Sequence, residues 1–178
     1  MADADTIPPV RIQPLRGCLP FSSTGAHEGL RFFNQYVHPA ESARFGSGFV
    51  VPRACVQWYT DGVPIQIIIW KERALIRRAL SLPAVDRRHR ATFEADAPGT
   101  PFDPMQCRVI YDPQGRSVRL QCLETTRARC IPIATQTLVE VTGDGRLAAL
   151  WMLEVGGAED DAHGHMFGAI NALRARTR

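Results

Sequence analysis

The sequence predicts an α+β fold in which a curved antiparallel sheet wraps around helices. Residues 56–82 have the pattern of a strand, a tight turn at Asp61-Gly62, an apolar extended segment and, from Trp70 to Leu82, an amphipathic helix. Residues 105–155 follow as consecutive strand-like segments separated by short turns, which is the pattern of an antiparallel sheet. The apolar stripe of the helix needs a sheet that buries it, so we expect the two parts to pack together.

The remaining elements follow in chain order. The first helix is expected from Ser23-Thr24 to Val37, where Pro39 stops it, and a short helical piece is expected around Glu41–Phe45. A terminal helix is expected over residues 158–176, with acidic residues at its start and arginines at its end. The expected strands share β-branched and aromatic residues and cover residues 49–60, 63–69, 90–96, 105–112, 117–126, 131–141 and 147–155.

Composition bounds the possible roles of the chain. Its 178 residues, 45% hydrophobic and 22% charged, suit one globular domain, which we place at residues 24–178 after a flexible, proline-rich lead over residues 1–23. A net charge of +3 neither requires nor excludes nucleic acid as a partner. Five cysteines without a CxxC pair, and no signal peptide, predict reduced thiols in a cytosolic or nuclear compartment. No apolar run approaches the length of a membrane span, so no membrane partner is predicted.

Five stretches of sequence resemble a known family. They are FFNQYV, ACVQWYTDGVPI, LSLP followed by His89 and Asp96, RVIYDPQGRSVRLQCLE and LVEVTGDGRLAALWMLEV, all within residues 28–155. Their order and residues resemble the nuclear transport factor 2-like superfamily, a cone-shaped, cystatin-like fold, and within it the small subunits of eukaryotic mRNA export heterodimers. The terminal helix would be an addition to that fold.

The resemblance implies a non-enzymatic role without a cofactor. The chain would pair through its sheet face with a larger export receptor subunit that has a matching domain. The pair would bind the Phe-Gly repeats of nuclear pore proteins, in the nucleus and at the pore, and shuttle to the cytoplasm. Other members of the family are enzymes, so the alternative is a small-molecule isomerase, dehydratase or cyclase. A homodimer with an unknown ligand is a third possibility.

The partner hypothesis rests on two predicted strands. Both faces of the strand over residues 147–155 are apolar, so one face is exposed unless something covers it. Either the terminal helix or a partner would cover it. The residues predicted to bind the partner are Thr135, Thr137, Val139, Leu150, Trp151 and Met152.

The enzyme hypothesis needs acid–base side chains inside the cone. The candidates are His89 and Asp96, together with Tyr59 and Asp61. Each also has a purely structural explanation. His89 lies in the charged run RRHR, Asp61 precedes a turn glycine, and Asp96 precedes a proline-rich loop.

Nucleic-acid and metal binding have weaker signals. Arg77 and Arg78, followed by Arg87 and Arg88, would form a basic patch for weak RNA contact, although a solvated helix face is the more common explanation for such a pattern. No metal site is predicted, because the histidines of the HGH motif at 163–165 are two residues apart on the expected helix and point to different sides.

Overall fold

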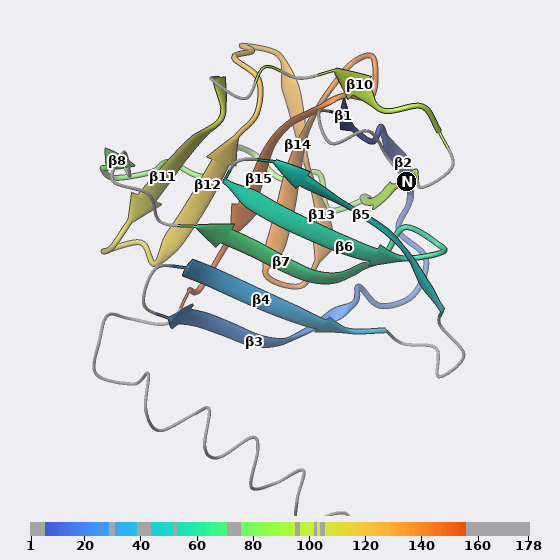
Figure 1. Ribbon diagram of the computed structural model, residues 1–178, viewed down its shortest axis with the longest axis horizontal. Coiled ribbons are helices and arrows are strands. Elements are labelled where there is room, and N and C mark those ends of the chain that lie inside the picture. The colour runs from blue at the N-terminus through green and yellow to red at the C-terminus, as the bar shows by residue number, and fades with distance from the viewer. Residues whose placement is uncertain are drawn as a thin grey trace, which may run out of the picture.

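The computed structural model describes residues 6–28, 31–38, 44–51, 53–70, 76–94, 97–101, 103 and 106–155. These residues form fifteen β-strands and no α-helix (Figure 1). The predicted α+β fold, a sheet wrapped around helices, is therefore wrong. Within the described ranges, no helix is long and apolar enough to cross a membrane.

A five-stranded antiparallel sheet forms one layer of the molecule. Its order is β3 (Phe21–Glu28), β4 (Arg31–Val37), β7 (Pro64–Trp70), β6 (Ala54–Tyr59) and β5 (Phe45–Val51). The strand predicted over 63–69 is confirmed in β7. The segment predicted as extended over 49–60 is two strands rather than one, because β5 ends at Val51, β6 begins at Ala54 and the two pair antiparallel.

The helix predicted from residues 24 to 37 is wrong, because this segment is the hairpin of β3 and β4. In β4 the side chains of Phe32, Asn34 and Tyr36 are buried and their neighbours are more exposed, which is the two-residue period of a strand. The short helix expected at Glu41–Phe45 falls mostly on residues outside the described part of the chain, and its last residue, Phe45, begins β5.

A six-stranded sheet forms the second layer. Its order is β13 (Ala128–Ala134), β14 (Thr137–Thr142), β15 (Leu147–Met152), β12 (Ser117–Gln121), β11 (Arg108–Asp112) and β8 (Ile76–Arg77), in which only β8 runs parallel to its neighbour. The antiparallel strands predicted between residues 105 and 155 are confirmed, with one correction. Residues 131–141 are not one long strand, because the chain turns at Thr135-Gln136 and pairs with itself.

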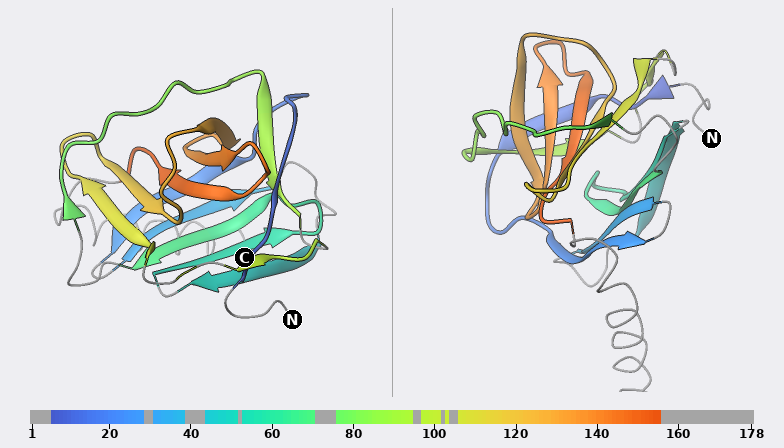
Figure 2. Two further views of the ribbon diagram at one scale, coloured as in Figure 1. Left: turned by 90° about the horizontal axis from the view of Figure 1, so that it is seen from above. Right: turned by 90° about the vertical axis from the view of Figure 1, so that its left-hand side faces the viewer.

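The two large sheets pack face to face as a β-sandwich (Figures 1 and 2). One hydrophobic cluster joins them, and it includes Phe32, Tyr36, Val56, Ile67 and Ile69 from the first sheet and Val109, Leu120, Ile131, Val139 and Leu150 from the second. Two specific contacts also cross the layers. The hydroxyls of Tyr36 and Thr137 share a short hydrogen bond, and the rings of Phe32 and Tyr111 lie with centroids 4.9 Å apart.

Two short ribbons complete the sandwich near the N-terminus. β1 (Thr6–Ile7) pairs with β10 (Thr100–Pro101), and β2 (Val10–Pro14) pairs with β9 (His89–Phe93). Ile7 and Val10 are each 5% exposed and belong to the main core. Residues 6–14 of the predicted flexible lead are thus paired with the domain.

A long extended segment crosses the outer face of the six-stranded sheet. We call residues 78–88, which connect β8 to β9, the strap (Figure 2). Leu80 and Val85 of the strap pack on a second cluster formed by Cys130, Leu138 and Trp151. The helix predicted from Trp70 to Leu82 is wrong where the structure describes it, because Trp70 ends β7 and residues 76–82 are extended.

Backbone hydrogen bonds hold the strap in place. The Leu80 N–H donates to Asp112 Oδ2 (3.0 Å), and the Asp86 N–H donates to the Cys130 carbonyl (2.8 Å). The apolar outer face that the sequence left uncovered is therefore covered by the strap. The terminal helix expected at 158–176, the other candidate cover, lies outside the described residues.

Candidate functional site

A buried polar network lies under one end of the strap, on three adjacent strands. Arg119 comes from β12, Trp151 from β15 and Glu140 from β14. In the strand register Arg119 stands opposite Trp151, while Ala149 stands between Gln121 and Glu140. Because Ala149 has no side chain beyond Cβ, Arg119 can reach Glu140 across the strand that separates them.

The network fixes the guanidinium of Arg119 in one orientation. Its Nε and Nη2 donate to the two carboxylate oxygens of Glu140 (2.9 and 3.0 Å), and its Nη1 donates to Gln121 Oε1 (2.9 Å). The Trp151 indole N–H donates to Glu140 Oε1 (2.6 Å), and Arg119 Cζ lies 5.5 Å from the centroid of the Trp151 ring. The side chains of Arg119 and Glu140 are only 16% and 12% exposed, so this bidentate geometry offsets the cost of removing two charges from water.

An open groove of about 330 Å³ lies between this network and the strap. Its lining residues are Arg78, Ala79, Leu80, Ser81 and Pro83 from the strap, and Arg119, Glu140 and Trp151 from the sheet. A second depression of about 610 Å³ is lined by Arg119, Gln121, Glu124, Thr125 and Thr126. Arg119 lines both hollows and is the residue that they share.

The charge of the groove is positive. Glu140 neutralises Arg119, but no acidic side chain among the described residues forms an ion pair with Arg78. Cys130 belongs to the same outer face, where burial and the nearby Glu140 carboxylate raise its pKa to about 11, so this thiol stays protonated and is no nucleophile. The groove therefore offers cationic and hydrogen-bonding side chains for a polar anion rather than a reactive group.

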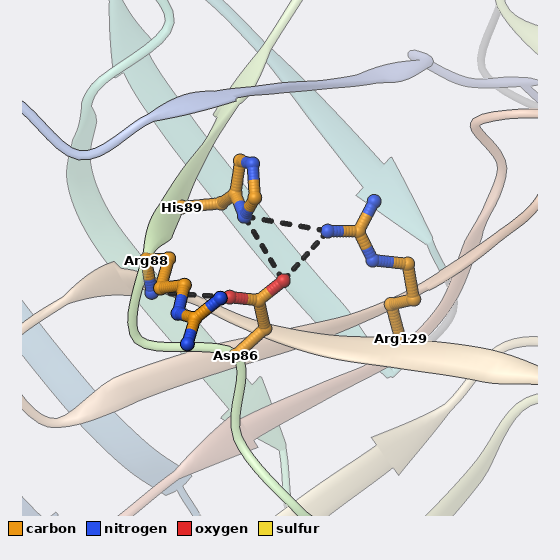
Figure 3. Close-up of polar contacts among 4 residues, drawn as sticks. All are labelled: Asp86, Arg88, His89 and Arg129. Carbon is orange, nitrogen blue, oxygen red and sulfur yellow. Dashed lines mark hydrogen bonds and ion pairs between the residues drawn. The ribbon is translucent and has the colours of Figure 1, made fainter.

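The predicted catalytic histidine lies at the other end of the strap (Figure 3). His89 Nδ1 is 3.0 Å from Asp86 Oδ2, and Arg129 Nη2 donates to the same oxygen (2.6 Å). The backbone N–H of Arg88 donates to Asp86 Oδ1 (3.0 Å). The hydrogen bond from Arg129, followed by that from Arg88, lowers the pKa of Asp86 to about 2. His89 is thus paired with Asp86, and the predicted partner, Asp96, lies outside the described residues.

The other predicted catalytic residues lie beside a different histidine. His38 Nε2 is 2.8 Å from Asp61 Oδ2, and the rings of His38 and Tyr59 meet edge to face with centroids 4.8 Å apart. Asp61 also accepts the Val63 N–H, as a turn residue does. The predicted set therefore divides into two separate groups, one around His89 and one around His38.

The residues predicted to bind a partner lie largely inside the chain. Thr137, Val139, Leu150 and Met152 are 0% exposed and Trp151 is 3% exposed. Val139, Leu150 and Met152 belong to the main core between the sheets, whereas Trp151 packs under the strap. Thr135 is exposed in the turn between β13 and β14, where its N–H donates to the Pro20 carbonyl (3.0 Å).

The arginines predicted to contact RNA are all exposed but do not form one patch. Arg77 and Arg78 lie where the strap begins, and Arg87 and Arg88 lie where it ends. The extended strap separates the two pairs across the width of the sheet (Figure 2).

Neither the comparison with protein-family models nor that with curated proteins gave a match to this sequence. Within the described ranges, no group of three or more His, Cys, Asp or Glu side chains is placed to hold a metal ion.

Arg119 and Glu140 are not among the site residues predicted from the sequence. The available signal was a charged residue in the middle of each of two apolar strands, SVRLQ and TLVEV. A charge in such a position is buried only when it is paired, so two opposite charges of this kind indicate a buried ion pair.

Proposed function

We propose that the protein is a non-enzymatic binding module, and that a small ligand with a carboxylate or phosphate group occupies the groove between the strap and the six-stranded sheet. The observation that carries this proposal is the Arg119 guanidinium, which Glu140, Gln121 and Trp151 hold in one orientation on a residue that lines both hollows. A preorganised donor loses little entropy when it binds an anion.

The composition of the groove supports a small polar ligand. Its volume of about 330 Å³ is at the lower end of the range for small-molecule sites, roughly 300–1,000 Å³. Arg78 supplies the positive charge that Glu140 does not balance. The hydroxyl of Ser81 in the groove, and the hydroxyl of Thr126 and the amide of Gln121 in the adjoining depression, offer hydrogen bonds to the rest of the ligand. Because no histidine or cysteine is among the lining residues, binding is better supported than catalysis.

The export role stays a prediction. It was inferred from a resemblance to a cone-shaped fold, and the described residues form a β-sandwich instead. The larger receptor subunit, the Phe-Gly repeats and the location at the nuclear pore have no support from the geometry of the described residues.

The test is an NMR titration of the ¹⁵N-labelled chain with inorganic phosphate and, separately, with succinate. The indole N–H signal of Trp151, assigned through the Trp151→Phe variant, is the reporter because this group lies in the wall of the groove. We expect this signal to move in a saturable way with at least one of the two anions. An unchanged signal with both anions would overturn the proposal.

Two matched variants locate the binding site. Arg78→Gln should weaken binding about tenfold, since it removes one charge-assisted contact worth about 1.4 kcal/mol. Arg87→Gln, at the far end of the strap, should leave the affinity unchanged. The same variants with a single-stranded oligouridylate distinguish the RNA hypothesis. If both variants lose affinity equally and oligouridylate binds more tightly than phosphate, the small-ligand groove is the wrong site. The protein would then bind RNA through its exposed arginines.

A further inference from the structure

Cys107 and Cys122 face each other at the open end of the hairpin of β11 and β12. The strand register pairs Arg108 with Gln121, so one further step places Cys107 opposite Cys122. The Cys122 N–H donates to the Ala148 carbonyl (2.8 Å), and its backbone polar groups therefore point toward β15 and away from β11. This is the non-hydrogen-bonded type of pair, in which Cα atoms are about 4.5 Å apart, within the range of roughly 4.4–6.8 Å that a disulfide spans.

The two thiols are in direct contact and are not equivalent. They share a hydrogen bond, which is the largest cause of the lowered pKa of Cys107 and of the raised pKa of Cys122. The positive charge of Arg53 lowers the pKa of Cys107 further. Cys107 is therefore the better nucleophile of the pair, and Cys122 lies within reach as the resolving thiol.

We propose that Cys107 and Cys122 form a reversible cross-strand disulfide when the protein meets a peroxide. The Cys107 thiolate attacks one oxygen of hydrogen peroxide, the O–O bond breaks and hydroxide leaves, which gives a sulfenic acid. The Cys122 sulfur then attacks the Cys107 sulfur, the S–O bond breaks and water leaves with the Cys122 proton. Both sulfurs are oxidised, and one peroxide is reduced to two waters once hydroxide takes up the proton lost by Cys107.

The two thiols are buried, although the chain neighbours of Cys107 are exposed. Both thiols are 0% exposed, but Gln106 and Arg108, on either side of Cys107, are exposed. Because both thiols are buried, we expect a slower reaction with peroxide than at an exposed thiol. The inference does not depend on the ligand of the groove.

Peptide mapping tests the disulfide directly in the full-length chain. After hydrogen peroxide treatment, remaining thiols are alkylated and the chain is digested with trypsin without reduction. Cleavage after Arg90, Arg108, Arg119 and Arg127 puts Cys107 in the peptide 91–108 and Cys122 in the peptide 120–127. We expect these two peptides as one linked species whose mass is lower by two hydrogen atoms than their sum, and we expect dithiothreitol to separate them.

Thiol counting and a second variant complete the test. Two of the five thiols should become unreactive in the unfolded, oxidised chain. Cys18→Ser should change neither the linked species nor its rate of formation, because Cys18 is exposed and remote in sequence from the hairpin. Cys107→Ser should abolish the linked species and leave Cys122 open to alkylation. If peroxide consumes Cys18 or Cys55 while peptides 91–108 and 120–127 stay separate in the folded wild-type chain, the proposal is wrong.

Discussion

Asp86 anchors the end of the strap through a single carboxylate. Its Oδ2 accepts a hydrogen bond from Arg129 on β13 and contacts His89 on β9, while its Oδ1 accepts the backbone N–H of Arg88. The geometry favours the charged form of Asp86, which is why its pKa is about 2. Asp86 therefore stabilises the folded state only while its carboxylate is ionised.

The sign of the pH dependence follows from this lowered pKa. An unfolded Asp has a pKa of about 3.9, so Asp86 stabilises the fold fully above that pH and loses its contribution as pH falls toward 2. We expect Asp86→Asn to be less stable than the wild type at pH 6, and the difference to shrink steadily between about pH 4 and pH 2. Urea unfolding followed by tryptophan fluorescence at a series of pH values measures it.

A second variant checks the cause of this pH dependence. Arg129→Gln removes the largest contribution to the lowered pKa of Asp86, so its difference from the wild type should shrink over the same pH range. The wild type will still lose stability in acid because the pKa values of Asp112 and Asp144 are also lowered, mainly by hydrogen bonds from the Gly115 N–H and the Thr142 hydroxyl. A difference between wild type and Asp86→Asn that is independent of pH would contradict the assignment.

At the scale of elements, the strands with continuous apolar residues could be predicted from the sequence. The predictions were wrong for segments whose burial depends on pairing with strands distant in the sequence. In β4 the core-facing positions include Asn34, which is buried beside Thr137 of the other sheet, while the apolar Val37 is 55% exposed. Because a polar residue is buried and an apolar residue is exposed, the sequence of β4 does not show the alternation of apolar and polar residues that is typical of a strand. Its apolar residues instead resemble the stripe of an amphipathic helix. The sequence of the strap was also ambiguous between a helix and an extended segment. Its apolar and polar contacts are with β11, β13 and β15, which are distant in the sequence.

The candidate groove could not be predicted from the sequence, because it also depends on which strands pair. Trp151 stands out in the sequence, but its role depends on which residues its neighbouring strands bring beside it. Arg119 and Glu140 meet only because β12 and β14 both pair with β15 in a specific register. The register of β14 against β15 belongs to a local hairpin, but that of β12 against β15 is set by non-local pairing, which no local pattern in the chain reports.

The turn between β6 and β7 gives a test at this scale. Gly62 has φ +80°, and a Cβ there would lie 2.1 Å from the Phe93 carbonyl oxygen, so the turn and β9 are packed backbone to backbone. Gly62→Ala should combine about 1 kcal/mol of backbone strain with a clash that displaces β9, for a total loss of roughly 3 kcal/mol or more.

A second glycine separates the two effects. Gly17 has nearly the same φ, +77°, but nothing lies within 4 Å of a Cβ at this position. Gly17→Ala should therefore cost only about 1 kcal/mol, as measured by urea unfolding. Equal losses in the two variants would show that the close approach of Gly62 to Phe93 does not contribute to stability.

At the scale of the whole molecule, the sandwich is closed by its own N-terminal segment. The sheets are joined mainly by one core, and Ile7 and Val10 extend that core beyond the two large sheets. Backbone hydrogen bonds from Val10 to Gly145 (2.9 Å) and from Glu94 to Pro9 (3.0 Å) tie this segment to both β9 and the turn after β14. A segment that the sequence predicts as a flexible lead therefore contributes both apolar burial and strand pairing.

Deletion of residues 1–15 should strongly destabilise the protein. It removes Ile7 and Val10, each 5% exposed, and it leaves β9 without its partner β2. Burial of two such side chains contributes roughly 3–6 kcal/mol, and the unpaired edge of β9 should promote aggregation. Deletion of residues 1–5 is the matched control, since it keeps every one of these contacts. Urea unfolding midpoints and the monomer yield in size-exclusion chromatography compare the two proteins. If both truncations unfold at the same urea concentration, residues 6–15 are a dispensable lead after all, and β2 does not stabilise the sandwich.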